Sequence, residues 1–195
     1  MNSTNYITAE IYIKEDDIFE RIINSFENAK YENSWGNDET DYKYENEKEI
    51  KKCVITINDK PISFGYFYKF KKKGKYKIKY SFSKKLTNLS YMFSDCNSLT
   101  NIDLSNFNTQ NVKDMSYMFS SCKSLSNIDL SNINTENVKN MQDMFNGCQS
   151  LTNIDLSNFN TQNTTKISFM FFNCKLLTKE NLITKDKNIL YEFSH

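Results

Sequence analysis

A repeat with a fixed period constrains the second half of the chain more than any other feature. Four of the five cysteines stand 26 residues apart, and a Met-Phe pair precedes each of them by the same distance. Three copies of the unit are nearly complete, and the fourth degenerates after Leu177. A period of roughly 20–29 residues is typical of leucine-rich repeats, whose units bury a shared core by stacking. The Met-Phe pairs are Met92-Phe93, Met118-Phe119, Met144-Phe145 and Met170-Phe171.

Each copy also contains the pattern of a short strand. In the first copy Leu99, Ile102 and Leu104 follow the L-x-x-L-x-L spacing. Alternate side chains of a strand point to opposite faces, so Ile102 and Leu104 are expected in the core and their polar neighbours outside. We interpret these polar neighbours as a binding surface on the concave side of the repeats. Its predicted residues are Asn101, Asp103, Ser105, Asn127, Asp129, Ser131, Asn153, Asp155 and Ser157.

The repeated unit resembles the BspA-like leucine-rich repeats. Their units carry an A-F-x-x-C-x-x-L-x-x-I-like segment, matched here by Met118-Phe119, Cys122, Leu125 and Ile128. The resemblance covers residues 89–185 and implies a solenoid that serves in adhesion or protein binding, often as a surface protein.

The first half has a different pattern, which predicts the order β-α-β-β-β. Apolar side chains alternate over residues 6–13, which indicates a strand, and recur every four residues over 16–29, which indicates an amphipathic helix. The polar segment 33–46 predicts a loop. The remaining strands are expected at residues 50–57, 62–70 and 75–82.

These patterns predict two domains. Residues 1–86 are expected to form an α+β N-terminal cap domain that covers the exposed end of the repeats. Residues 87–195 are expected to form a short leucine-rich-repeat solenoid, with three full 26-residue repeats and a degenerate C-terminal capping repeat.

The repeated cysteines are expected to stack as a structural ladder in the core. Zinc sites draw on closely spaced cysteine pairs, whereas these stand one per unit with no histidine between them. The expected strand spacing lies inside the Cα distance range of disulfides, but parallel Cβ directions oppose bridging. Core packing is the favoured interpretation, with a disulfide or a metal site as open alternatives, and no cofactor is expected. The ladder is Cys96, Cys122, Cys148 and Cys174.

Catalysis has little support in the sequence. The only histidine is His195, the last residue, so mechanisms that need an imidazole base lack one inside the fold. The sequence contains neither of the glycine-rich phosphate-binding motifs G-x-x-x-x-G-K-[ST] and G-x-G-x-x-G. We therefore predict no catalytic residues and a protein that is not an enzyme.

Lysines cluster near the middle of the chain. A basic strip can contact phosphates, but edge strands also carry lysine to prevent aggregation, and the aromatic neighbours are expected on the opposite face. We favour a solvated face and expect no nucleic-acid partner. The cluster is Lys69, Lys71, Lys72, Lys73, Lys75, Lys77 and Lys79.

The repeated aspartates are the main functional candidate. Three carboxylates about 5 Å apart repel one another by roughly 0.8 kcal/mol per pair in water, so the column at Asp103, Asp129 and Asp155 is suited to a basic partner or to cations. Alternatively, each carboxylate accepts a hydrogen bond from a neighbouring Ser or Asn and serves the repeat alone. We predict a non-catalytic module that binds a protein partner. The alternatives are a self-assembling structural protein and, third, an enzyme.

Charge and hydropathy do not point to a membrane. The 25 basic and 24 acidic residues nearly cancel, and no stretch approaches the roughly 18 apolar residues of a transmembrane helix. No membrane insertion is expected. No signal peptide is visible in residues 1–13, so the expected location is the cytoplasm for a full-length chain, or the cell surface if a targeting segment has been removed.

Overall fold

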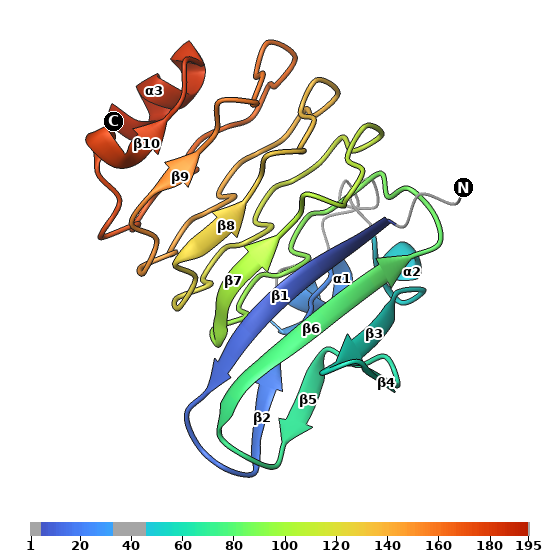
Figure 1. Cartoon of the computed structure of the whole chain (residues 1–195). Coiled ribbons are helices and arrows are strands. Elements are labelled where there is room, and N and C mark those ends of the chain that lie inside the picture. Colours follow the sequence, from blue (N-terminus) through green and yellow to red (C-terminus); the bar gives the residue numbers. More distant parts are fainter. Residues whose placement is uncertain (1–4, 33–45, 195) are drawn as a thin grey trace.

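The N-terminal strand pairs with both halves of the sequence. In the computed structural model, which describes residues 5–32 and 46–194, β1 (Asn5–Ile13) lies between β6 (Gly74–Phe82) and β7 (Leu99–Asp103) and is antiparallel to both. The six-stranded sheet has the order β4-β3-β6-β1-β7-β8 (Figure 1). Its other strands are β3 (Val54–Ile57), β4 (Lys60–Ile62) and β8 (Asn127–Asp129).

Smaller elements complete the described part of the chain. Two short ladders, β2 with β5 and β9 with β10, lie outside the six-stranded sheet. The helices α1 and α2 lie behind the sheet in Figure 1, and α3 lies at the opposite end of the molecule. These elements are β2 (Ile18–Arg21), α1 (Phe26–Glu32), α2 (Glu47–Ile50), β5 (Phe67–Phe70), β9 (Ile154–Asp155), the 3₁₀ helix η2 (Lys179–Asn181), β10 (Leu182–Ile183) and α3 (Lys187–Ser194).

The predicted fold class, an α+β cap followed by a leucine-rich-repeat solenoid, is wrong. The described residues form a small sheet-dominated domain with a mixed six-stranded sheet and three α-helices, and no solenoid. The physical reason lies at β1, which hydrogen-bonds to the first strand of the repeats as well as to β6. The strands of the repeats are also very short, because β8 has three residues and β9 has two.

The helix predicted over residues 16–29 is also wrong. Residues 18–21 form β2, which pairs antiparallel with β5, and α1 begins only at Phe26. An apolar spacing of four fits a strand as well as a helix, because four is a multiple of the strand period of two. The start of α1 is set by Ser25, whose Oγ accepts the Asn28 N–H at 3.1 Å. The predicted loop at 33–46, apart from Asn46, and His195 lie outside the described residues.

Successive 26-residue units lie against one another in register. Parallel bridges join Asn88 to Asp114, Asp114 to Asn140, and Asn140 to Lys166. Deeper in the core the rings of the Met-Phe pairs stack face to face, with centroids 5.7, 5.7 and 5.9 Å apart. The units therefore share one continuous core rather than four separate ones.

The C-terminal segment supplies hydrogen-bond acceptors that the fourth unit lacks. In the third unit the Asp143 N–H donates to the carbonyl of Ser168 in the next unit. At the equivalent position of the fourth unit, Phe169 N–H donates instead to Glu192 Oε2 of α3 at 3.1 Å. Ile189 of the same helix is fully buried. The helix thus covers the end of the units and satisfies backbone donors that would otherwise lose their partners.

Candidate binding face

The register of the sheet places chemically distinct side chains in one row across its outer side. Pairing aligns Lys79 of β6 with Thr8 of β1, Thr8 with Asp103 of β7, and Asp103 with Asp129 of β8. One unit further on, Asp155 of β9 is the equivalent residue. We call the outer side of β3, β6, β1, β7, β8 and β9 the binding face. No helix of the described residues covers it in Figure 1.

Burial confirms that inward and outward side chains alternate on these strands. Ile102 and Leu104 are fully buried, whereas Asp103 between them is partly exposed. Asp129 and Asp155 are exposed. The predicted Asn and Ser residues two positions before and after each aspartate also lie on this face. Two of them, Asn101 and Ser105, are partly exposed. The other four are exposed: Asn127, Ser131, Asn153 and Ser157.

Each aspartate of the column holds the turn that follows its strand. The backbone N–H groups of the serines two residues later donate to Oδ1 of Asp103, Asp129 and Asp155 at 2.8, 2.9 and 2.8 Å. Hydrogen bonds from Ser157 lower the pKa of Asp155. One oxygen of each carboxylate therefore has a structural use. In the described part of the chain none of the three carboxylates lies in an ion pair.

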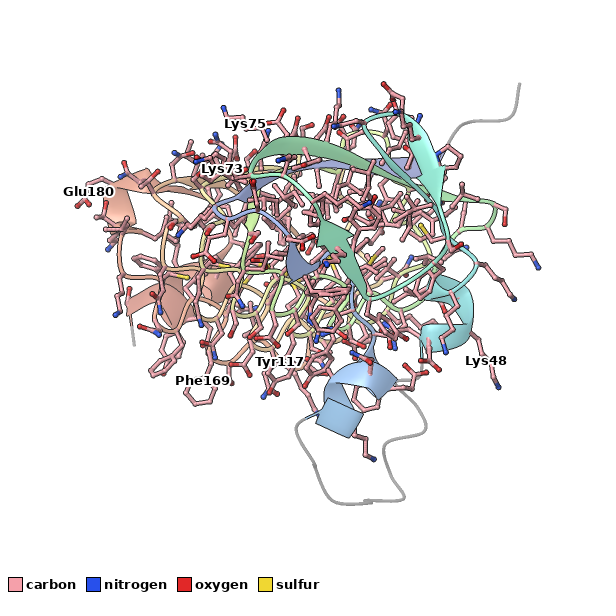
Figure 2. All side chains as sticks on the ribbon, turned by 90° about the horizontal axis from the view of Figure 1, so that it is seen from below. Lys48, Lys73, Lys75, Tyr117, Phe169 and Glu180 are labelled. Carbon is pink, nitrogen blue, oxygen red and sulfur yellow. The ribbon has the colours of Figure 1, made fainter. Side chains whose placement is uncertain are left out.

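The lysines of the cluster differ in their partners. Lys69 of β5 and Lys72 of the turn that follows it pair with Asp17 and Asp16 at 3.0 and 3.4 Å. On β6, by contrast, the Lys79 ammonium lies 4.1 Å from the centre of the Tyr6 ring, a cation–π contact that holds it on the binding face. Lys75 and Lys77 are exposed on the same side of β6. Figure 2 shows Lys75 on the opposite side of the molecule from Tyr117 and Phe169.

Sequence reasoning did not connect the lysines with the aspartates. The connection depends on β1, whose Thr8 and Glu10 stand between the two charged groups on the same face. Sequence reasoning also missed Ile183, which pairs with Asp155. The two residues are 28 apart rather than 26, because the last unit has two additional residues before this strand. Ile183 is 56% exposed, so the aspartate column ends at an apolar side chain.

A shallow polar groove adjoins the binding face where the strands end. Ser105 lines it together with amide side chains of the following turns. Several of these amides are already engaged, because Asn108 Oδ1 accepts the Gln110 N–H and Asn134 Oδ1 accepts the Glu136 N–H. The groove therefore extends the polar surface of the face but brings together no acid, base and nucleophile.

The repeated cysteines are free thiols in the core. Cys122, Cys148 and Cys174 donate through Sγ to a carbonyl of the preceding unit at 3.0, 3.2 and 3.0 Å. Burial raises the pKa of the Cys174 thiol to about 12 and raises those of Cys122 and Cys148 well above their usual value. Among the described residues no group of three or more His, Cys, Asp or Glu is placed to hold a metal ion. No helix in this part of the chain is long and apolar enough to cross a membrane.

Asp114 is a buried carboxylate in a row of equivalent polar residues, Asn88, Asp114 and Asn140, that bridges successive units. Asp114 accepts the Ser116 N–H and Oγ–H on Oδ1 and the Asn140 amide on Oδ2. Burial nevertheless raises the pKa of Asp114 above its usual value, because the hydrogen bonds offset only part of the desolvation. Asparagine stands at the equivalent positions 88 and 140.

Asp114→Asn is therefore expected to stabilise the protein at neutral pH. A carboxylate with a raised folded-state pKa destabilises the fold increasingly as pH rises from the unfolded pKa through the folded one. The variant should raise Tm at pH 7 by about 2–4 °C, the shift that corresponds to 1 kcal/mol in a chain of this size. Thermal unfolding followed by circular dichroism tests this. The gain should disappear below pH 3.8, the ordinary carboxyl pKa, and a gain that is constant with pH would contradict the explanation.

Comparison with known families identifies the repeated half of the chain. Residues 65–185 match the family described as Mycoplasma protein of unknown function, DUF285. The match covers more than half of the 195 residues and includes every copy of the repeat. The chain belongs to this family. No curated protein and no solved structure matches it.

Membership of DUF285 corrects the predicted family. The predicted membership of the BspA-like leucine-rich repeats is wrong, and the description of the units as leucine-rich repeats is therefore not supported. The spacing of Phe119, Cys122, Leu125 and Ile128 reflects the need of each unit for side chains that reach a shared core. Unrelated families with stacked units meet the same need, so this spacing alone does not distinguish them.

Proposed function

We propose that this protein is a non-catalytic module that binds a protein partner through the binding face. The observation that carries the proposal is the aspartate column. Asp103 and Asp129 lie on paired strands at a spacing of about 4.8 Å, and Asp155 is the equivalent residue of the next unit. All three lie on an uncovered face, and none forms an ion pair with the described residues. Like charges held this close repel one another, and basic groups of a partner would relieve that repulsion.

The geometry of the carboxylates supports recognition of basic side chains. Each Oδ1 accepts one backbone N–H, which fixes the orientation of the carboxylate before any partner arrives. Oδ2 can then accept a hydrogen bond from an ammonium or guanidinium group. A preorganised acceptor loses less conformational entropy on binding than a mobile one.

A defined peptide tests the proposal. The probe is a fluorescent peptide of alternating lysine and serine, with a glutamate–serine peptide as its charge-reversed match, and binding is followed by anisotropy. The wild-type protein should bind only the basic peptide. The variant Asp103→Asn, Asp129→Asn, Asp155→Asn should bind at least about tenfold more weakly, since three exposed ion pairs contribute up to roughly 1 kcal/mol each.

The triple variant keeps the turn geometry, because an asparagine Oδ1 accepts the same serine N–H groups. Glu136→Gln is the matched control, since it removes an exposed carboxylate outside the sheet and should leave binding unchanged. Equal binding of the basic peptide by the wild type and the triple variant would reject the aspartate column as the site. Failure of the wild type to bind it would reject the proposed function.

A further inference from the structure

Donors and acceptors are segregated along one row of the binding face. On one side of the line between β1 and β7, the row described above carries Thr56, Lys79 and Thr8. On the other side it carries only the carboxylates of the aspartate column. One half of the face thus presents hydroxyl and ammonium donors, and the other half presents acceptors at the same height along the strands.

We propose that the occupant of the binding face is a second copy of this chain, docked face to face about a two-fold axis that runs along the strands between β1 and β7. The inference rests on the proposed function, because it names the partner of the same face. The axis places strands that are equally far from it opposite each other, β1 against β7 and β6 against β8. It also places β3 against β9, which follows β8 in Figure 1 without belonging to the six-stranded sheet. Two-fold dimers of this kind use one self-complementary surface on both copies.

Every residue of the row meets a complementary group in this arrangement. Lys79 of the second copy stands opposite Asp129, because both strands lie about 7 Å from the axis. Thr8 opposes Asp103, and Thr56 opposes Asp155, so that hydroxyl groups face carboxylates. Aligned sheets pack about 10 Å apart, a distance that lysine and aspartate side chains span together.

The adjacent row is complementary as well. It contains Lys77 and Glu10, paired across β6 and β1, followed by Asn101 and Asn127 on β7 and β8. The same axis sets Lys77 against Asn127 and Glu10 against Asn101. An amide both donates and accepts, so it can satisfy either charge.

The size and charge of the face are adequate for such a dimer. Strands of nine residues are about 30 Å long, and six strands span about 29 Å. Because β8 and β9 are short, the usable area is on the order of 700 Å², close to the roughly 800 Å² per partner of a standard interface. Because the net charge of the chain is only +1, two copies repel each other weakly at long range.

Charge reversal at one opposed pair tests the inference by sedimentation equilibrium at low salt. The wild type should dimerise, and high salt should weaken the dimer because exposed charges are screened. Lys79→Glu alone and Asp129→Lys alone should each weaken self-association by about tenfold, since each creates two symmetry-related like-charge pairs. An equimolar mixture of the two variants should associate at least as tightly as the wild type, because both pairs are then opposite in charge.

Two control variants make the same changes in net charge away from the sheet. Lys139→Glu and Glu136→Lys alter exposed residues of the turns and should leave self-association unchanged. A wild type that stays monomeric at the highest soluble concentration would overturn the inference. So would a dimer that neither face variant weakens, or a mixture that remains monomeric.

The peptide experiment separates this inference from the proposed function. A monomeric wild type that binds the basic peptide through its aspartates would overturn the second copy as occupant and leave the binding module in place. A wild type that neither binds the peptide nor self-associates would overturn both. Dimerisation that follows the charge-reversal pattern, together with a basic peptide that competes with the second copy for the face, would support both.

Discussion

Replacing Phe119 by alanine is expected to lower the free energy of unfolding by about 3–5 kcal/mol. The Phe119 ring is fully buried between those of Phe93 and Phe145, and both centroids lie 5.7 Å away. Its removal leaves a cavity in the middle of the stack. Backbone hydrogen bonds from Phe93 to Met118 and from Phe119 to Met144, both 2.9 Å, hold the neighbouring units at their spacing, so the rings cannot close the gap.

Urea unfolding followed by circular dichroism measures this loss. Phe172→Ala is the matched control, because it removes a phenylalanine of the fourth unit that is 62% exposed. This change should stay within about 0.5 kcal/mol of the wild type. A loss below about 1 kcal/mol for Phe119→Ala would mean that the ring stack does not carry the core, and the repeated Met-Phe pairs would then need another explanation.

The periodic part of the fold could be predicted because the same residues recur in the same place. The repeat placed Ile102 and Leu104 in the core and Asp103 outside, and the burial of these side chains agrees. Such predictions follow from local alternation, which depends only on neighbours in the sequence. The predicted binding role of the outward residues stays a prediction, because burial does not show what a surface contacts.

The order of the sheet could not be predicted from the same patterns. Nothing in residues 5–13 indicates which strands flank them, because alternation defines the faces of a strand but not its neighbours. The pairing of Glu10 with both Lys77 and Asn101 is what brings the lysines and the aspartates onto one face. The residues of the candidate site were therefore only partly grouped, because the sequence patterns gave the aspartate column without the lysines that share its face.

The first of the two left-handed turn positions in a unit carried no visible signal where an aromatic residue occupies it. Each unit passes through the left-handed region at two positions, and Tyr91, Tyr117 and Phe169 have φ values of 60°, 56° and 61°. Gly147 and Asn173 mark the second position in the third and fourth units. The aromatic residues at the first position give no such mark, because most residues with a side chain adopt positive φ only at a cost. At Tyr91 and Tyr117, packing compensates for the cost of positive φ, because the two rings stack with their centroids 4.6 Å apart. Tertiary contacts of this kind are invisible to local sequence rules.

Separating the chain at the predicted domain boundary is expected to abolish folding of both parts. Residues 1–86 and 87–195 should each show little native circular dichroism and rapid proteolysis, while the whole chain unfolds in a single transition. The reason is that the two parts share one core across the boundary. The ring centroids of Tyr80 and Phe93 lie 5.3 Å apart, and those of Phe82 and Phe107 lie 5.4 Å apart.

Hydrogen bonds across the boundary strengthen this expectation. The buried amides of Asn24 and Asn46 donate to the carbonyls of Ser94 and Ser90 at 3.2 and 2.6 Å. In the isolated second part those carbonyls and the edge of β7 would lose their partners, and exposed strand edges promote aggregation. In the isolated first part the amides and the Tyr80 ring would face solvent.

Mixing the two parts supplies the decisive comparison. If the core is shared, an equimolar mixture should regain a fraction of the native circular dichroism and of the protection from protease that neither part has alone. A second part that is natively folded and unfolds cooperatively without β1 would contradict this expectation. In that case the contacts between β1 and β7 would be a docking interface between two independent folding units, and the binding face would form only when the units come together.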